Sequence, residues 1–171
     1  AKFVAQLRTQ AGPFYDSIAG GEPFDLRYAP EIEVDLECDD LGVARLAFGE
    51  QLERNREREL VLKTAVVGPH RDDLTILIDG LPARTHGSQG QWRTAAVSLK
   101  LAIYQMLREK RRMAPLLLLD EIFAELDERR TAALISGFGA VEQLFLTTAL
   151  EPPEPLRTQA ARFRIENGTI V

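Results

Sequence analysis

The sequence predicts an α/β fold with a parallel sheet, on the basis of two features of its second half. Four consecutive leucines, Leu116 to Leu119, run directly into Asp120. A short run of uniform hydrophobicity is typical of a strand that is buried on both faces of a parallel sheet. From residue 88 onward, segments with helical spacing of apolar residues also alternate with short apolar strands. This alternation predicts parallel strands with helices packed against the sheet.

The first sixty residues predict a more helical region. Apolar residues at helical spacing predict a helix over residues 2–19, which ends at Gly20-Gly21-Glu22-Pro23. Alternating apolar and polar residues predict short strands over 24–28 and 32–36. Residues 41–58 combine a partly apolar face with charges of both signs, which predicts a second helix with an exposed surface.

The next fifty residues predict two strands followed by a long helix. β-Branched and apolar residues predict a strand over 61–67. Alternation over 74–78, followed by Asp79-Gly80, predicts a β-hairpin. We expect a polar loop over 83–87 and then a helix over 88–110 with a broad apolar face.

The last third of the chain predicts two strands with a helix between them, and then a hairpin. The leucine run supplies the first strand, a helix follows over 127–136, and 143–148 is a second buried strand. The proline-rich segment 151–155 predicts a rigid loop. Asn167-Gly168 predicts the turn of a closing hairpin over 161–171.

The composition is that of an ordinary soluble protein. Of the 171 residues, 45% are hydrophobic and 27% are charged, and the formal net charge is -5. The negative charge excludes a protein that coats nucleic acid by bulk charge, so DNA contact would require a local basic patch. The candidate patch comprises Arg93, Lys100, Arg108, Lys110, Arg111 and Arg112. We favour a structural interpretation, because cations at the end of a helix face the negative end of its dipole.

The sequence gives no indication of a disulfide, a cysteine- or histidine-rich metal site, or a membrane span. Cys38 is the single cysteine, and His70 and His86 are the two histidines. The longest apolar run, 114–119, is far shorter than the ~20 residues that a bilayer requires. We expect a cytoplasmic location. We also expect further sequence before Ala1, because no Met or N-cap precedes the first helix.

Asp120 and Glu121 are the strongest candidates for catalytic chemistry. They follow a predicted core strand and therefore lie at the carboxyl edge of the sheet, where open α/β sheets bind ligands. Asp120 is suited to hold Mg²⁺ against nucleotide phosphates, and Glu121 is suited to orient or deprotonate an attacking water. The alternative interpretation is structural: two acids can follow a buried strand only because the chain becomes exposed to solvent there.

A second candidate site precedes the long helix, in Gly87-Ser88-Gln89-Gly90-Gln91. Glycine lets the backbone approach a phosphate closely, and the helix start supplies free N–H groups and the positive end of the dipole. Ser88 adds a hydroxyl donor, so the segment predicts an anion site. The alternative is an ordinary N-cap formed by Ser88, which an isolated motif of this kind favours.

A third motif, Ala124-Glu125-Leu126-Asp127, places another acid near the same edge, although Asp127 is also a candidate N-cap. The three motifs have a definite order, because Ser88 precedes Asp120 by 32 residues and Asp127 follows it by seven. In this order and spacing they resemble the signature motif, Walker B motif and D-loop of ATP-binding-cassette (ABC) ATPases.

A finer resemblance is to the RecF family of bacterial recombination and repair proteins, and it is good from about residue 60 to the end. The matching segments are Gly68 to Leu74, Gly87 to Gln91, Arg93 to Ala95, Ser98 to Ala102, Leu117 to Asp127 and Ile165 to Gly168. The resemblance implies the C-terminal part of an ABC-type P-loop ATPase head, with a parallel-sheet core and a signature helix. Residues 61–171 would belong to ATPase lobe I and residues 1–60 to a mainly helical lobe II.

The resemblance also implies a weak ATPase that dimerises on ATP. Family members resemble the ATPase heads of SMC proteins, in which two subunits enclose two ATP molecules. By analogy, Ser88 and Gly90 contact the γ-phosphate bound to the partner subunit, and Gln89 and Gln91 belong to the same ATP-binding segment. The analogy also assigns Asp120 to the Mg²⁺ site and Glu121 to the positioning of the attacking water.

Two other residues gain roles by the same analogy. Asp127 would cross the dimer interface, and Thr147 or Thr148 stands where many cassette ATPases carry a histidine. The sequence also departs from the pattern, because no Gly-x-x-x-x-Gly-Lys-Ser/Thr loop occurs in it. We explain this departure by a Walker A loop that lies upstream of Ala1.

The resemblance implies partners as well. The family binds double-stranded DNA when ATP is bound, and works with RecO and RecR to load RecA at gaps. The expected partners are therefore double-stranded DNA, single/double-strand junctions, RecR, RecO and a second subunit, but no membrane. Two alternatives remain open: another cassette ATPase, such as a transporter subunit or a true SMC head, and a non-catalytic interaction module.

Three further residues, two in the first matching segment and one beside the second, have other interpretations. His70 and Arg71 either pack and pair at a strand end, Arg71 with Asp72 or Asp73, or have a functional role. Trp92 is expected to contribute to packing rather than to stack on DNA.

Overall fold

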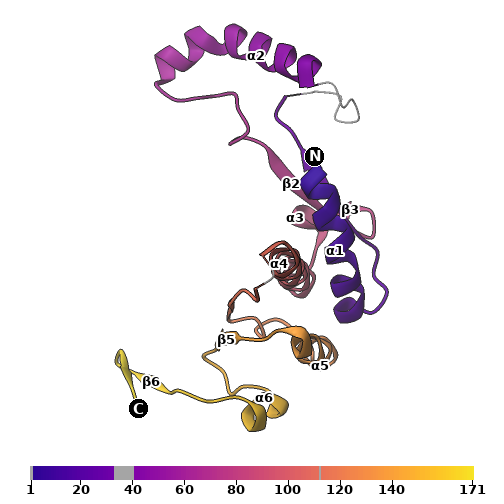
Figure 1. Cartoon of the computed structure of the whole chain (residues 1–171), viewed down its shortest axis with the longest axis vertical. Coiled ribbons are helices and arrows are strands. Elements are labelled where there is room, and N and C mark those ends of the chain that lie inside the picture. Colours follow the sequence, from indigo (N-terminus) through magenta and orange to yellow (C-terminus); the bar gives the residue numbers. More distant parts are fainter. Residues whose placement is uncertain (1, 33–40, 112) are drawn as a thin grey trace.

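The computed structural model describes residues 2–32, 41–111 and 113–171, which form an elongated α/β arrangement (Figure 1). Within these residues there is a three-stranded antiparallel sheet, a parallel pair of strands, and a short hairpin near the C-terminus. The parallel pair and the helices packed on it confirm the predicted α/β class.

Helix α1 (Lys2–Ala19) is the predicted first helix, and it packs against α4, α5 and β1. Its buried side chains recur at helical spacing, and they are Val4, Leu7, Ala11, Tyr15, Ile18 and Ala19. The helix ends at Gly20, whose backbone has a φ of 76° and whose N–H donates to the Asp16 carbonyl at 2.7 Å. Glycine adopts this left-handed conformation without a steric penalty.

The antiparallel sheet pairs the segment that follows α1 with residues 73–82. Strand β1 (Phe24–Ala29) pairs with β2 (Asp73–Ile78), which continues into β3 (Leu81–Pro82). The turn between β2 and β3 has positive φ at both Asp79 and Gly80, as predicted for a tight hairpin. The division into lobes at residue 60 stays a prediction, and in the structure α1 and β1 pack against elements from beyond that residue.

Helix α2 (Leu41–Leu62) stands apart from the other elements at one end of the molecule (Figure 1). The strand predicted over 61–67 is wrong, because α2 continues to Leu62 and no strand follows before β2. The backbone N–H groups of Val66 and Val67 instead donate to the Glu59 carboxylate, at 2.7 and 3.2 Å. The strand predicted over 32–36 lies outside the described residues except for Ile32.

The segment around residue 72 is held by hydrogen bonds to the region after β1. The Tyr28 hydroxyl and the Glu31 N–H both donate to the Asp72 carboxylate. These bonds lower the pKa of Asp72, and the bond to the carboxylate raises the pKa of Tyr28 to about 12. Asp72 thus pairs with Tyr28 rather than with Arg71.

Its neighbours also have structural partners. Asp73 forms an ion pair with Arg84 at 3.8 Å. Among the described residues, neither Asp72 nor Asp73 forms an ion pair with Arg71. The imidazole Nε2 of His70 lies 3.4 Å from the Ala65 carbonyl oxygen. These contacts favour the structural interpretation of His70, whereas a function for Arg71 stays open.

The loop predicted over 83–87 is wrong, because residues Ala83–His86 form a single helical turn, α3. The turn is closed by a hydrogen bond from the Gly87 N–H to the Ala83 carbonyl at 2.8 Å. The Trp92 indole N–H donates to the same carbonyl at 2.7 Å, while the side chain is 37% exposed, so the packing role of Trp92 stays a prediction. Helix α4 (Gln89–Arg111) then follows as predicted.

The parallel pair consists of β4 (Leu117–Asp120) and β5 (Leu144–Thr147), joined through α5 (Glu128–Gly137) and a 3-10 turn, η1 (Phe138–Ala140). Leu117 and Leu119 are buried in a core with side chains of α4, α5, α1, η1 and the loop that follows β4.

The prediction that β4 is buried on both faces is wrong. Leu118 is 62% exposed and its register partner Phe145 is 50% exposed. Among the described elements, α4 and α5 contribute the core on one face of the pair, and no core cluster includes these two side chains.

The chain ends with α6 (Glu154–Gln159) and a hairpin of β6 (Ile165–Glu166) and β7 (Thr169–Ile170). The hairpin confirms the prediction from Asn167-Gly168, both of which have positive φ. The rigid loop predicted over 151–155 is wrong in its last two residues, because α6 begins at Glu154, directly after Pro153. None of the described helices has the length and apolar character needed to span a bilayer.

Candidate functional site

The first candidate acid and Thr147 lie side by side at the carboxyl edge of the parallel pair. Asp120 ends β4 and is the register partner of Thr147, which ends β5. The Thr147 hydroxyl donates a hydrogen bond to the Asp120 carboxylate, which is otherwise exposed to solvent. The structure therefore brings together two residues that the sequence places 27 positions apart.

Glu121 is held against the end of β5 by three hydrogen bonds. Its N–H donates to the Thr147 carbonyl at 3.0 Å, and its carboxylate accepts from the Ala149 N–H at 2.6 Å. The Arg93 guanidinium, from α4, donates to the Glu121 carbonyl. Glu121 has a φ of 48°, a left-handed conformation that costs roughly 1–2 kcal/mol in a residue with a β-carbon. These bonds offset that cost and fix the direction of the side chain.

The side chains at this edge fit a Mg²⁺ ion that is bound together with a nucleotide. Mg²⁺ in such sites takes one or two carboxylates and completes its shell with water and phosphate oxygens. Asp120 supplies an exposed carboxylate and Thr147 a neighbouring hydroxyl. The described part of the chain holds no group of three or more His, Cys, Asp or Glu side chains that could bind an ion by itself.

The predicted signature segment forms a reciprocal cap at the start of α4. The Gln91 N–H donates to the Ser88 hydroxyl at 3.2 Å, and the Ser88 N–H donates to the Gln91 side-chain oxygen at 2.8 Å. This arrangement is a capping box, which satisfies two N–H groups at the helix start. Ser88 therefore acts as an N-cap, while the exposed tip leaves the first-turn N–H groups of Gln89 and Gly90 without partners inside the helix.

The third motif packs directly on this tip. A β-carbon added to Gly90 would lie 2.9 Å from the Glu125 carbonyl oxygen, so the close approach requires glycine. With its amide nitrogen facing the carboxylate, Gln89 donates to both Glu125 side-chain oxygens, at 2.9 and 3.2 Å. The signature segment and the segment 124–127 are thus one contiguous surface.

Gly90→Ala is expected to destabilise the protein by about 1–3 kcal/mol, because the added methyl group meets backbone that must move. The substitution would otherwise gain up to ~1 kcal/mol of helix propensity. Gly137→Ala is the matched control, since Gly137 ends α5 with nothing within 4 Å of a β-carbon. Denaturant unfolding should show a loss for the first variant and no loss for the second, and equal stability would contradict the close packing.

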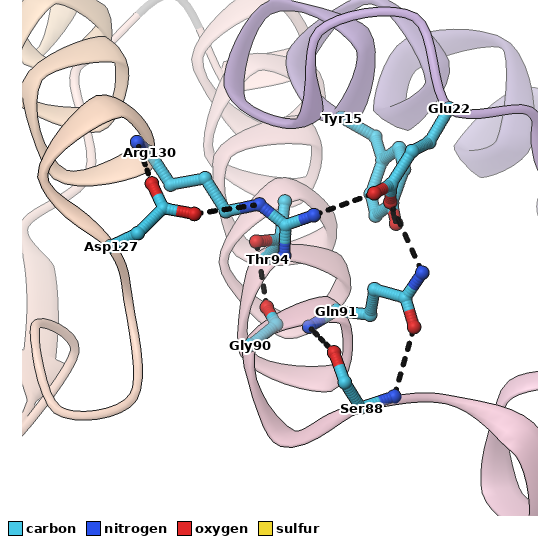
Figure 2. A network of polar contacts seen from close by, with 8 residues as sticks. All are labelled: Tyr15, Glu22, Ser88, Gly90, Gln91, Thr94, Asp127 and Arg130. Atoms are coloured by element: carbon cyan, nitrogen blue, oxygen red, sulfur yellow. Dashed lines mark hydrogen bonds and ion pairs between the residues drawn. The ribbon is translucent and has the colours of Figure 1, made fainter.

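Asp127 caps α5, and Arg130 ties that helix to α1 (Figure 2). The Asp127 carboxylate accepts from the Arg130 N–H at 2.7 Å and lies 3.8 Å from the Arg130 guanidinium. The same guanidinium forms an ion pair at 2.7 Å with Glu22, in the turn after α1. Glu22 also accepts from Tyr15 and Gln91, so the network extends from α5 to the signature cap.

A surface cleft of about 440 Å³ lies between α4 and the end of β4. Its lining includes Gln89 from the signature segment, Asp120 from the strand end and Glu125 from the third motif. One residue of each of the three motifs therefore lines the same cleft. The rest of the lining is Trp92, Arg93, Ala96, Val97, Lys100 and Ile122.

The candidate basic patch is partly used within the fold. Arg108 forms an ion pair with Glu142 at 3.0 Å, and Arg93 is bonded to the Glu121 carbonyl. Both contacts support the structural interpretation of these cations. Arg112 lies outside the described residues.

The sequence patterns did not indicate the roles of Glu22, Arg130 and the Ala149 N–H. Glu22 and Arg130 are 108 residues apart, and each occurs in a segment interpreted only as a helix end or helix start.

Comparison with known proteins identifies the family. The chain is 36% identical over 173 residues to the DNA replication and repair protein RecF of Bacillus velezensis, a match that covers 99% of this chain and 46% of that protein. It is 27% identical to a solved structure of the recombination mediator protein RecF with ATP, in the RecFOR pathway. That match has a TM-score of 0.73 and covers 99% of this chain and 44% of the solved one.

A more distant neighbour is an SMC head bound to the winged-helix domain of ScpA, at 14% identity and a TM-score of 0.52, which shows a likeness of fold alone. No protein-family model matches the sequence. The chain spans less than half the length of the RecF relatives that it matches. This chain belongs to the RecF family and corresponds to a C-terminal part of its members, and its fold is shared with an SMC head.

Proposed function

We propose that the protein carrying this chain is a RecF-type DNA repair ATPase, to which the chain contributes the Walker B acids, the signature tip and the D-loop. The observation that carries this proposal is the cleft lined by Gln89, Asp120 and Glu125, one residue from each motif. The three motifs therefore share one face of the chain, where Asp120 and Glu121 would act on ATP held in the same subunit while the tip meets the γ-phosphate of ATP held by the partner.

The strand-end residues have distinct roles in this proposal. Asp120 and Thr147 hold Mg²⁺, which when bound neutralises charge that develops on the phosphates. Glu121 positions the attacking water. One of its carboxylate oxygens is fixed by the Ala149 N–H at 2.6 Å, which leaves the other for the water.

The signature tip acts across a dimer interface. Ser88 and Gln89 are exposed, as is Asp127, so a second subunit can reach them. The N–H groups of Gln89 and Gly90, at the positive end of the α4 dipole, are suited to donate hydrogen bonds to a terminal phosphate. ATP held by one subunit would thus join the two, with Gln91 maintaining the shape of the tip.

The biological setting follows from the relatives. They are named DNA replication and repair proteins, and the solved structures are assigned to the RecFOR pathway. We therefore assign to this protein binding of double-stranded DNA and of single/double-strand junctions, cooperation with RecR and RecO in loading RecA at gaps, and a cytoplasmic location.

The test uses the whole protein that contains this chain. Sedimentation should show monomers without nucleotide and dimers with ATP and Mg²⁺, and phosphate release should be slow and stimulated by double-stranded DNA. Failure to bind ATP at all would favour a non-catalytic interaction module. ATP-driven dimers without any response to DNA would favour another kind of cassette ATPase.

A further inference from the structure

Glu22, which belongs to none of the three motifs, connects two of them. Its side chain is 27% exposed and lies in the turn between α1 and β1. One carboxylate oxygen accepts from Arg130 at 2.7 Å. The other accepts from the Tyr15 hydroxyl at 2.9 Å and from the Gln91 side-chain nitrogen at 3.4 Å. Side chains of α1, α4 and α5 therefore meet at a single carboxylate (Figure 2).

On the side of the signature tip, Glu22 determines which way the Gln91 amide faces. A carboxylate can only accept hydrogen bonds, so the NH₂ group of Gln91 must face it. The amide oxygen is then left to accept from the Ser88 N–H at 2.8 Å. A glutamine at position 22 would weaken this constraint, because its amide can present either an oxygen or an NH₂ group to Gln91.

On the side of the D-loop, Glu22 supplies the counter-charge for Arg130. The Arg130 side chain is 13% exposed, and a guanidinium that is so largely buried requires a paired carboxylate. From this position Arg130 reaches Asp127 at 3.8 Å and would lie 3.3 Å from a β-carbon on Gly90. Arg130 thus contacts both segments that we assign to the dimer interface.

We propose that Glu22 is a positioning residue for ATP hydrolysis, which keeps the signature tip and the D-loop in a fixed mutual arrangement so that both reach the partner subunit together. This inference rests on the proposed function, in which both segments act across the dimer interface. Glu22 acts through Gln91 and Arg130 and contacts no nucleotide itself. Burial and the bond to Glu22 raise the pKa of Tyr15, so its hydroxyl stays protonated and donates to Glu22.

The test is Glu22→Gln in the whole protein, with kcat and KM for ATP measured separately. We expect kcat to fall by about tenfold, because a small displacement of the tip or the D-loop impairs the reacting geometry. We expect KM and ATP binding by the monomer to change by less than about twofold, because Glu22 acts on the transition state through the partner's site. Arg130→Lys keeps the charge but loses the forked geometry, so it should lower kcat in the same way.

Tyr15→Phe is the matched control. It removes one hydrogen bond from Glu22 and keeps the buried ring, while the links to Gln91 and Arg130 remain. Its kcat should stay near the wild-type value even if its thermal midpoint falls. An equal fall in kcat for Tyr15→Phe would show that Glu22 only supports folding, and would overturn the inference.

The remaining outcomes are also decisive. If Glu22→Gln does not fold, Arg130→Lys replaces it as the deciding variant. A wild-type kcat in the folded variant overturns the role of Glu22 while leaving the proposed function intact. If the wild-type protein neither hydrolyses ATP nor dimerises on it, the proposed function itself has failed.

Discussion

Glu121→Gln is expected to lower the rate of ATP hydrolysis by about 10²–10⁴-fold, the range typical of a lost general base. The amide keeps the shape of the side chain, and its oxygen can still accept from the Ala149 N–H that holds Glu121 in place. The variant should therefore bind ATP and dimerise as the wild-type protein does. Single-turnover phosphate release measures the first effect, and sedimentation with ATP measures the second.

Glu109→Gln provides the control for the loss of one negative charge. Glu109 is exposed on α4 and accepts a hydrogen bond from Gln105, at a distance in sequence from all three motifs. Its rate of hydrolysis should be unchanged. An unchanged rate in Glu121→Gln as well would show that another group activates the water.

Ser88→Arg is expected to abolish ATP-dependent dimerisation while ATP binding by the monomer survives. The long cationic side chain would occupy the exposed tip where the partner's phosphate must arrive, and the Ser88 cap on Gln91 would be lost. Loss of the cap alone costs only about 1 kcal/mol of stability, so the steric effect dominates. Sedimentation with ATP, together with a direct ATP-binding titration, measures both properties.

Ser88→Thr is the conservative control, because threonine retains the hydroxyl and is also a good N-cap. It should dimerise on ATP. Dimers of normal affinity in Ser88→Arg would mean that the tip of α4 does not face the second subunit.

The features that the sequence could predict are those encoded within a few residues. Asp79-Gly80 and Asn167-Gly168 specify tight turns by their tolerance of positive φ, and both hairpins are present. Ser88 and Gln91 are three residues apart, so the helix start was also a local signal. In each case the conformation depends on neighbours along the chain.

The features that could not be predicted depend on distant parts of the chain. The strand expected over 61–67 rested on β-branched residues, yet such preferences depend on a partner strand, and a side chain of α2 bonds these N–H groups instead. The exposure of Leu118 depends on which elements cover the second face of β4. The bond between Glu22 and Arg130 joins residues 108 positions apart, which no local pattern encodes.

The reciprocal cap between Ser88 and Gln91 has a thermodynamic consequence for assembly. Because the tip of α4 is already ordered in the single subunit, the conformational entropy of these residues is lost during folding. Association with a nucleotide-loaded subunit then needs no further ordering of the tip, so even a small number of hydrogen bonds to one phosphate can yield net affinity. In the proposed dimer, a pre-ordered surface of this kind would let bound nucleotide control the association of the two subunits.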